Sequence, residues 1–142
     1  MSFLLDTNVV SEWLKPRPNA GLVRWTESAD EGRIFLSVIS LAELRYGIDR
    51  MAVGKRQRRL EEWLRHELPI RFEGRILPVD APIADACGRI VRRSELLGRP
   101  IEAMDAFLAA TAEVHRLTLV TRNVSDFVVL KKILNPWTEM PP

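Results

Sequence analysis

Short apolar runs alternate with longer segments of helical periodicity along this chain. Residues 3–5, 34–37, 76–79 and 118–121 are short apolar runs of the kind found in buried strands. Apolar side chains at helical spacing predict helices over residues 9–14, 20–28, 41–51, 55–68, 81–97 and 102–114. Strands that alternate with helices are typical of a parallel sheet covered on both faces. We therefore expect an α/β fold, a three-layer α/β/α sandwich with a mostly parallel sheet of four to five strands.

Helix boundaries are indicated by residues with a clear conformational preference. Asn19 and Asp80 are suited to cap the helices that follow them, Pro69 is expected to stop the helix over residues 55–68, and Gly98 to close the helix over residues 81–97. The segment 124–127 predicts a short turn or helical step, and residues 130–134 leave the existence of a fifth strand open. The buried face of the helix over residues 81–97 is expected to carry Ile83, Cys87, Ile90, Val91 and Leu97.

Composition places the chain among ordinary globular proteins. With 142 residues, 46% hydrophobic and 28% charged, we expect one domain over residues 1–142. The single cysteine, Cys87, excludes an internal disulfide and reads as a small core side chain. The net charge of +2 says nothing about partners. No signal peptide or membrane-length apolar run is visible, so we expect a cytoplasmic protein with no membrane contact.

Four acidic residues stand near the predicted ends of strands. Asp6 follows the first strand, Glu43 lies early in the helix after the second, and Asp126 follows the fourth. Because the carboxyl ends of parallel strands share one edge of a sheet, these three side chains should converge. Asp105 reaches that edge only if its helix packs antiparallel to the preceding one, which the short link at residues 98–100 favours.

Each of these acids also has a purely structural explanation. Asp6 could cap the helix that follows it. Ser40 and Glu43 match a capping box, with Ser40 as the cap. Asp105 near a helix start is favoured by the helix dipole, and Asp126 could be a solvated turn residue. Asp105 fits this explanation least well, because apolar residues surround it in the sequence.

Taken together, the four acids predict a cation site. Carboxylates roughly 5 Å apart repel by about 3 kcal/mol per pair at an effective dielectric of about 20, so a cluster requires protons or cations. Oxygen ligands alone select a hard ion such as Mg²⁺, for which Mn²⁺ can substitute. The two histidines, His66 and His115, have no partner at metal-ligand spacing.

Four segments, at residues 4–9 (LLDTNV), 37–44 (SVISLAEL), 105–112 (DAFLAATA) and 121–127 (TRNVSDF), resemble those of PIN-domain ribonucleases. The resemblance is specifically to VapC-type toxins of bacterial toxin–antitoxin pairs, in the FitB-like branch. Residues 74–78 (GRILP) and 135–137 (NPW) also fit that branch. The match covers nearly the whole chain. It implies a PIN-like α/β/α sandwich and Mg²⁺-dependent endonucleolytic hydrolysis of RNA.

The resemblance also implies roles for individual residues. Asp6, Glu43 and Asp105 occupy the positions of the family's most regular catalytic, metal-binding acids. The fourth position falls on Asn123 in some relatives and on Asp126 in others. Asn123 supplies no charge, so the fourth role is assigned to Asp126 and Asn123 is a candidate supporting residue. Thr7 and Thr121 are candidate hydroxyls that orient the carboxylates. One or two ions would activate a water for in-line attack on the phosphodiester.

Basic residues and partners complete the hypothesis. Two sets are candidates for contact with the RNA backbone, and a solvated helix face is the alternative explanation for both: Arg50, Lys55, Arg56, Arg58 and Arg59, and separately Arg89, Arg92 and Arg93. The resemblance implies a homodimer and a small antitoxin of the VapB or FitA kind, through which alone the complex would bind DNA. An antitoxin basic side chain would enter the acidic pocket. Trp25 and Trp63 are candidate groove walls for it, or ordinary core residues.

Three other functions compete with this hypothesis. A haloacid-dehalogenase-type phosphatase also begins with a strand-end aspartate, but it carries a second one two residues later, where this chain has Asn8. A PIN-like module that binds nucleic acid or protein without catalysis is disfavoured because the three main acids are present. Structure-specific DNA cleavage usually accompanies insertions that this compact chain lacks.

Overall fold

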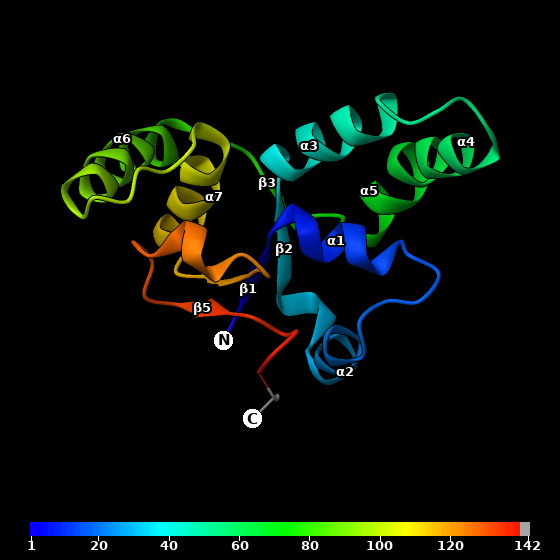
Figure 1. Ribbon diagram of the computed structural model, residues 1–142, viewed down its shortest axis with the longest axis horizontal. Coiled ribbons are helices and arrows are strands. Elements are labelled where there is room, and N and C mark those ends of the chain that lie inside the picture. Colours follow the sequence, from blue (N-terminus) through cyan, green and yellow to red (C-terminus); the bar gives the residue numbers. More distant parts are fainter. Residues whose placement is uncertain (140–142) are drawn as a thin grey trace.

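The computed structural model describes residues 1–139, and its centre is a five-stranded parallel sheet of order β3-β2-β1-β4-β5 (Figure 1). The central strand β1 (Phe3–Leu5) pairs with β2 (Ile34–Ser37) and with β4 (Thr118–Val120). The edge strands are β3 (Ile76–Leu77) and β5 (Ile133–Leu134). The expected parallel sheet is confirmed, and a fifth strand exists where the sequence left it open.

Helices cover both faces of this sheet and enclose two apolar cores (Figure 1). Leu5 and Val120 point into a core with α1 (Thr7–Trp13), α2 (Ala20–Ser28), α3 (Val38–Asp49) and the segment from α4 (Lys55–Glu62) to α5 (Leu68–Arg71). Leu4 and Leu119 point into the other core, with α6 (Ala81–Leu96) and α7 (Ala103–Val114). Neighbouring residues of a strand face opposite sides, so the strands supply both cores and the three-layer sandwich is confirmed.

The helix α3 begins three residues earlier than the sequence predicts. Its N-cap is Ser37, whose side chain accepts a hydrogen bond from the Ile39 N–H at 3.0 Å. Ser40 is fully buried within the helix and does not cap it, so the capping-box interpretation of Ser40 and Glu43 is wrong. The β-branched pair Val38–Ile39 resembles a continuation of β2, which concealed the true start.

The prediction that Pro69 ends the helix over residues 55–68 is also wrong. Helical backbone continues through the π-helical turn η2 (Trp63–Glu67) into α5, which contains Pro69 near its start. The Leu68 N–H donates to the carbonyl of Trp63, five residues back, so the hydrogen-bond register has already shifted before the proline. Trp63 is partly buried against the core and Trp25 is 4% exposed, which confirms the core interpretation of both tryptophans.

The helix α6 has the predicted cap and most of the predicted buried face. Asp80 accepts a hydrogen bond from the Ile83 N–H, and Ile83, Cys87 and Ile90 are buried. Leu97, however, is 59% exposed, because it is the C-cap where the backbone turns away toward Gly98 at φ +70°. Within residues 1–139, no helix has both the length and the apolar character needed to cross a membrane.

Candidate active site

Four acids from different elements influence one another electrostatically at the carboxyl edge of the sheet. Asp6 follows β1, Glu43 lies in the second turn of α3, Asp105 lies in the first turn of α7, and Asp126 lies in the 3-10 turn η3 (Val124–Phe127) after β4. The charges of Glu43 and Asp126 raise the pKa of Asp6. The charges of Asp6, Asp126 and Glu43 also raise the pKa of Asp105. The predicted convergence is therefore present, with Asp105 included.

Asp6 is the most firmly held of the four. Its side chain is 6% exposed and accepts hydrogen bonds from the Thr121 hydroxyl at 2.7 Å and from the Thr7 N–H at 2.7 Å. The Asn8 amide donates a third, at 3.2 Å. Burial raises the pKa of Asp6, and the hydrogen bonds from Thr121 and Thr7 oppose that shift without cancelling it. The hydrogen bonds thus fix the carboxylate in one orientation, although burial destabilises its charged form.

Glu43 is held by the first helix rather than by its own cap. The Thr7 hydroxyl donates to Glu43 Oε1 at 2.6 Å and lies 3.0 Å from the hydroxyl of buried Ser40. A hydroxyl has one proton, so donation to the carboxylate leaves Thr7 to accept from Ser40. Thr7 therefore joins two acids, with its N–H on Asp6 and its hydroxyl on Glu43.

Asp105 differs from both of these acids. Within residues 1–139 its side chain accepts no hydrogen bond that satisfies normal geometry. Burial first, and then the like charges of its neighbours, raise the pKa of Asp105 to about 6. Glu102, an exposed acid one turn earlier, adds to that shift. Asp105 therefore keeps a proton to a higher pH than an ordinary aspartate does, and its side chain is not committed to a hydrogen bond within residues 1–139.

The structure also distinguishes Asp126 from Asn123. The charge of exposed Asp126 acts on both Asp6 and Asp105. Asn123 contributes its backbone N–H to the Thr121 hydroxyl at 3.0 Å, while its side chain is exposed. The assignment of the fourth acidic position to Asp126 and of a supporting place to Asn123 stays a prediction.

Asn8 is a site residue that sequence reasoning missed. Its amide nitrogen donates to Asp6 and lies 3.2 Å from Thr121 Oγ1, and its amide oxygen accepts from the Arg122 N–H at 3.3 Å. Asn8 therefore connects α1 to the segment after β4. Its position two residues after the strand-end aspartate was a usable signal, because that spacing places a side-chain donor beside the carboxylate.

The donor set suits a hard cation, but the side chains are not arranged around one. All four groups offer carboxylate oxygens, the ligands that Mg²⁺ and Mn²⁺ prefer. In the described part of the chain, no group of three or more acidic, histidine or cysteine side chains stands ready to hold one ion. Asp6 and Glu43 are fixed by hydrogen bonds, whereas the Asp105 side chain accepts none within residues 1–139.

The two sets of candidate RNA-binding residues differ in their surroundings. The α4 residues are exposed and make no ion pair within residues 1–139, and the α6 residues each pair with an acid. The α4 set is Lys55, Arg56, Arg58 and Arg59, and the α6 pairs are Arg89 with Asp85, Arg92 with Glu95, and Arg93 with Glu113. Arg50, at the end of α3, is exposed and lies over the ring of Tyr46. The free cations of α4 are the better candidates for phosphate contact.

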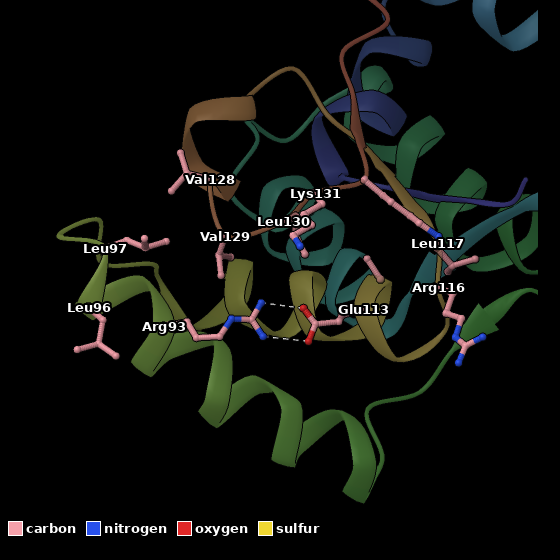
Figure 2. Close-up of a pocket in the computed structure, with 12 residues that line it drawn as sticks. Arg93, Leu96, Leu97, Glu113, Arg116, Leu117, Val128, Val129, Leu130 and Lys131 are labelled. Atoms are coloured by element: carbon pink, nitrogen blue, oxygen red, sulfur yellow. Dashed lines mark hydrogen bonds and ion pairs between the residues drawn. The ribbon is translucent and has the colours of Figure 1, made fainter.

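A groove of about 780 Å³ lies elsewhere, bounded by the ends of α6 and α7 and by residues 128–132 (Figure 2). Leu96, Leu97 and Val129 line it, and Arg93 pairs with Glu113 inside it at 2.9 Å. None of the four acids lines this groove. Its size therefore does not mark the chemistry, and the acid cluster remains the candidate active site.

Comparisons with known proteins agree with this geometry. Residues 3–131 match the PIN domain family. The chain is 41% identical to the toxin FitB of Neisseria gonorrhoeae, over 94% of this chain and 97% of that protein, and 33% identical to a VapC ribonuclease of Sinorhizobium fredii, over 94% and 96%. A solved structure of FitAB bound to a DNA fragment superposes with a TM-score of 0.90 at 38% identity and covers 98% of both chains. The chain therefore belongs to the PIN-domain family, in the group that contains the FitB and VapC toxins.

Proposed function

We propose that this protein is the toxin of a toxin–antitoxin pair and acts as a Mg²⁺-dependent endoribonuclease. The observation that carries the proposal is the convergence of four carboxylates from four segments, with the pKa of Asp105 raised to about 6. Mutual repulsion among carboxylates destabilises the fold unless a cation binds between them, so a cluster of this kind is typical of a cation site. The similarity to FitB, named a toxin, and to a VapC ribonuclease supports both parts of the proposal.

Asp6, Glu43, Asp105 and Asp126 would hold Mg²⁺, or Mn²⁺ in its place. Bound there, the metal would supply a water activated for attack and positive charge opposite the scissile phosphodiester. Asp6 and Glu43 are held in place by Thr121 and Thr7. Asp105 must lose its proton to bind the metal. Metal binding by Asp105 should therefore weaken as the pH falls below about 7.

The substrate strand needs positive charge beyond the acids. The exposed, unpaired cations at residues 55–59 of α4 would contact RNA phosphates, which supplies affinity with little sequence preference. The ion pairs of Arg89, Arg92 and Arg93 reduce the attraction that those residues offer. The RNA contact is therefore assigned mainly to the α4 side of the acid cluster.

A small antitoxin is the proposed protein partner. The similarity to FitB and to a FitAB complex bound to DNA supports a FitA-like antitoxin. As part of the same proposal, the toxin would be a homodimer and DNA would be bound through the antitoxin. A basic antitoxin side chain among the four carboxylates would relieve the repulsion that a cation otherwise relieves. Inhibition and metal binding would then compete for the same acids.

The test is cleavage of a mixed set of labelled RNAs by antitoxin-free protein, with Mg²⁺, with Mn²⁺ and with chelator. The Asp105→Asn variant is compared with Asp85→Asn, which removes an exposed acid of α6 that pairs with Arg89. We expect metal-dependent cleavage that Asp105→Asn loses and Asp85→Asn keeps. Cleavage that survives in Asp105→Asn would contradict the assigned site. No cleavage of any RNA with either metal, together with RNA binding, would favour a binding module without catalysis.

A further inference from the structure

The helix α3 presents three different flanks, and the acid Glu43 lies on one of them. At about 100° per residue, Leu44 and Ile48 mark the side buried in the core. Arg45 and Asp49 mark a second flank, where Arg45 pairs with Asp49 and with Glu61 of α4. The third flank carries Glu43, which accepts a hydrogen bond from Thr7, the residue whose N–H donates to Asp6, so this flank faces the acid cluster.

Arg50 lies on the same flank as Glu43, and Tyr46 lies between that flank and the one that carries Asp49. Tyr46 is about 60° around the helix from Glu43, and Arg50 is within about 20° of it and two turns farther along. The Arg50 guanidinium carbon lies 5.1 Å from the centroid of the Tyr46 ring. Along α3, away from the acid cluster, the chain thus presents the carboxylate of Glu43, then the ring of Tyr46, then the cation of Arg50.

Neither side chain has an evident structural task. Tyr46, the single tyrosine of the chain, is 63% exposed, and within residues 1–139 its hydroxyl makes no hydrogen bond. Arg50 is exposed and forms no ion pair in the same range, in contrast to Arg45 on the other flank. The Arg50 guanidinium lies over the Tyr46 ring, and the high exposure of the tyrosine side chain leaves ring surface that a planar group can reach.

We propose that Tyr46 stacks an unpaired base of the RNA strand, and that Arg50 contacts a phosphate of the same segment, next to the acid cluster. The proposal rests on the proposed ribonuclease function and specifies how the strand is held. Glu43 and Arg50 are about 10 Å apart along the helix axis, so one short segment of a single strand can reach both the acid cluster and Arg50. Aromatic stacking accepts any base, and Arg50 supplies attraction that the neighbouring acids do not.

The test measures RNA binding separately from cleavage. Anisotropy of a fluorescently labelled single-stranded RNA is recorded in chelator, with the full chain carrying Asp105→Asn so that the strand stays intact. In that background Tyr46→Ala is compared with Tyr46→Phe and Tyr46→Trp, and with Val53→Ala, which truncates a side chain that is 89% exposed just beyond α3. We expect Tyr46→Ala to weaken binding by roughly 5- to 100-fold, while the phenylalanine, tryptophan and Val53 variants bind as the parent does.

A second readout reports stacking itself. RNA that carries the fluorescent base 2-aminopurine at successive positions should show quenching at one or two positions, lost in Tyr46→Ala and retained in Tyr46→Phe. Equal binding by Tyr46→Ala and the parent would overturn the stacking proposal and leave the ribonuclease proposal intact. A Tyr46→Ala variant that instead loses self-association or antitoxin binding, with RNA binding unchanged, would assign the ring to a protein contact. Absence of RNA binding and cleavage in the wild-type protein would overturn both proposals.

Discussion

The acid cluster and the α6–α7 groove are opposite kinds of surface. The cluster gathers four charged side chains, ordered by hydrogen bonds such as Thr121 to Asp6, which join residues 115 positions apart. The groove is a much larger hollow, about 780 Å³, lined mainly by aliphatic side chains from neighbouring segments. A groove shows only that the surface is concave there. Like charges held close together destabilise the folded state, and such clusters are typical of functional sites. The proposed active site of this protein rests on the second criterion and not on the first.

The largest effect should come from neutralising one acid of the cluster. Asp6→Asn or Asp105→Asn should lower RNA cleavage roughly 100-fold or more, because each removes charge that holds the cation opposite the reacting phosphate. Stability should be retained or increased, since repulsion among the acids also falls. Cleavage rates and melting temperatures are measured beside Asp85→Asn. A variant that is both inactive and unfolded would make the acid structural rather than functional.

Metal binding should stabilise the cluster and leave the groove unaffected. At a metal concentration 100 times its Kd, selective binding to the native state adds about 2.7 kcal/mol to the free energy of unfolding. The melting temperature should therefore rise with Mg²⁺ or Mn²⁺ and rise less in Asp105→Asn. Thermal denaturation in a metal titration checks this. An equal rise in wild type and Asp105→Asn would place the ion elsewhere.

Removing the hydroxyl that anchors Asp6 should have an intermediate effect. Thr121→Val keeps the shape of this fully buried side chain but removes the 2.7 Å hydrogen bond to Asp6 and the acceptor of the Asn123 N–H. We expect a loss of about 1–3 kcal/mol in stability and roughly 10- to 100-fold in cleavage. The matched control is Thr118→Val at the start of β4, the strand that Thr121 follows; Thr118 is 8% exposed and lies at the opposite end of the strand from Asp6. Equal losses of stability and cleavage in both variants would show that the hydrogen bond from Thr121 to Asp6 has no specific role in cleavage.

The contribution of Asp105 to the free energy of unfolding should change with pH in the direction opposite to that of a paired carboxylate. The pKa of Asp105 is raised from 3.8 to about 6, so the folded state binds its proton more tightly than the unfolded state does. The stability that this proton provides is fully present below about pH 4 and is lost as the pH rises through about 6. The upper limit is about 3 kcal/mol, reduced because Asp105 is partly open to solvent.

The measurement is urea denaturation of wild type and Asp105→Asn in chelator between pH 4 and 7. The difference between the two proteins is informative, because paired acids such as Glu12 and Glu113, whose pKa values are lowered, lose stability in the opposite direction as the pH falls. We expect Asp105→Asn to gain stability relative to wild type as the pH rises. A constant difference across this range would contradict the raised pKa.

The same contrast between local and distant interactions explains how far the sequence predicts this structure. The helix α2 was predicted with its true bounds and cap, because Asn19 and the apolar spacing give the same answer locally. The convergence of Asp6, Glu43 and Asp126 follows from a rule about parallel strands that needs only the order of elements. These features depend on short stretches of sequence or on topology alone.

Features that depend on packing between distant segments were missed. The contact from Thr7 to Glu43 joins residues 36 apart and exists only because α1 packs against α3. Pro69 lies inside a helix because the π turn before it shifts the backbone register. Tyr46 gave no signal in the sequence, since its exposure depends on which segments pack against α3. Nothing in local periodicity determines these three outcomes.

The smallest effect should come from the groove. Arg93 and Glu113 pair at 2.9 Å, but both side chains are more than 40% exposed, so the pair should contribute at most about 1 kcal/mol. A double-mutant cycle of Arg93→Ala and Glu113→Ala, measured by urea denaturation, gives the coupling energy. Cleavage should be unchanged in all three variants, because the groove does not contact the acids. If Arg93→Ala lowered cleavage as far as Asp105→Asn does, the groove would be part of the RNA-binding surface, and the two regions would be one functional unit.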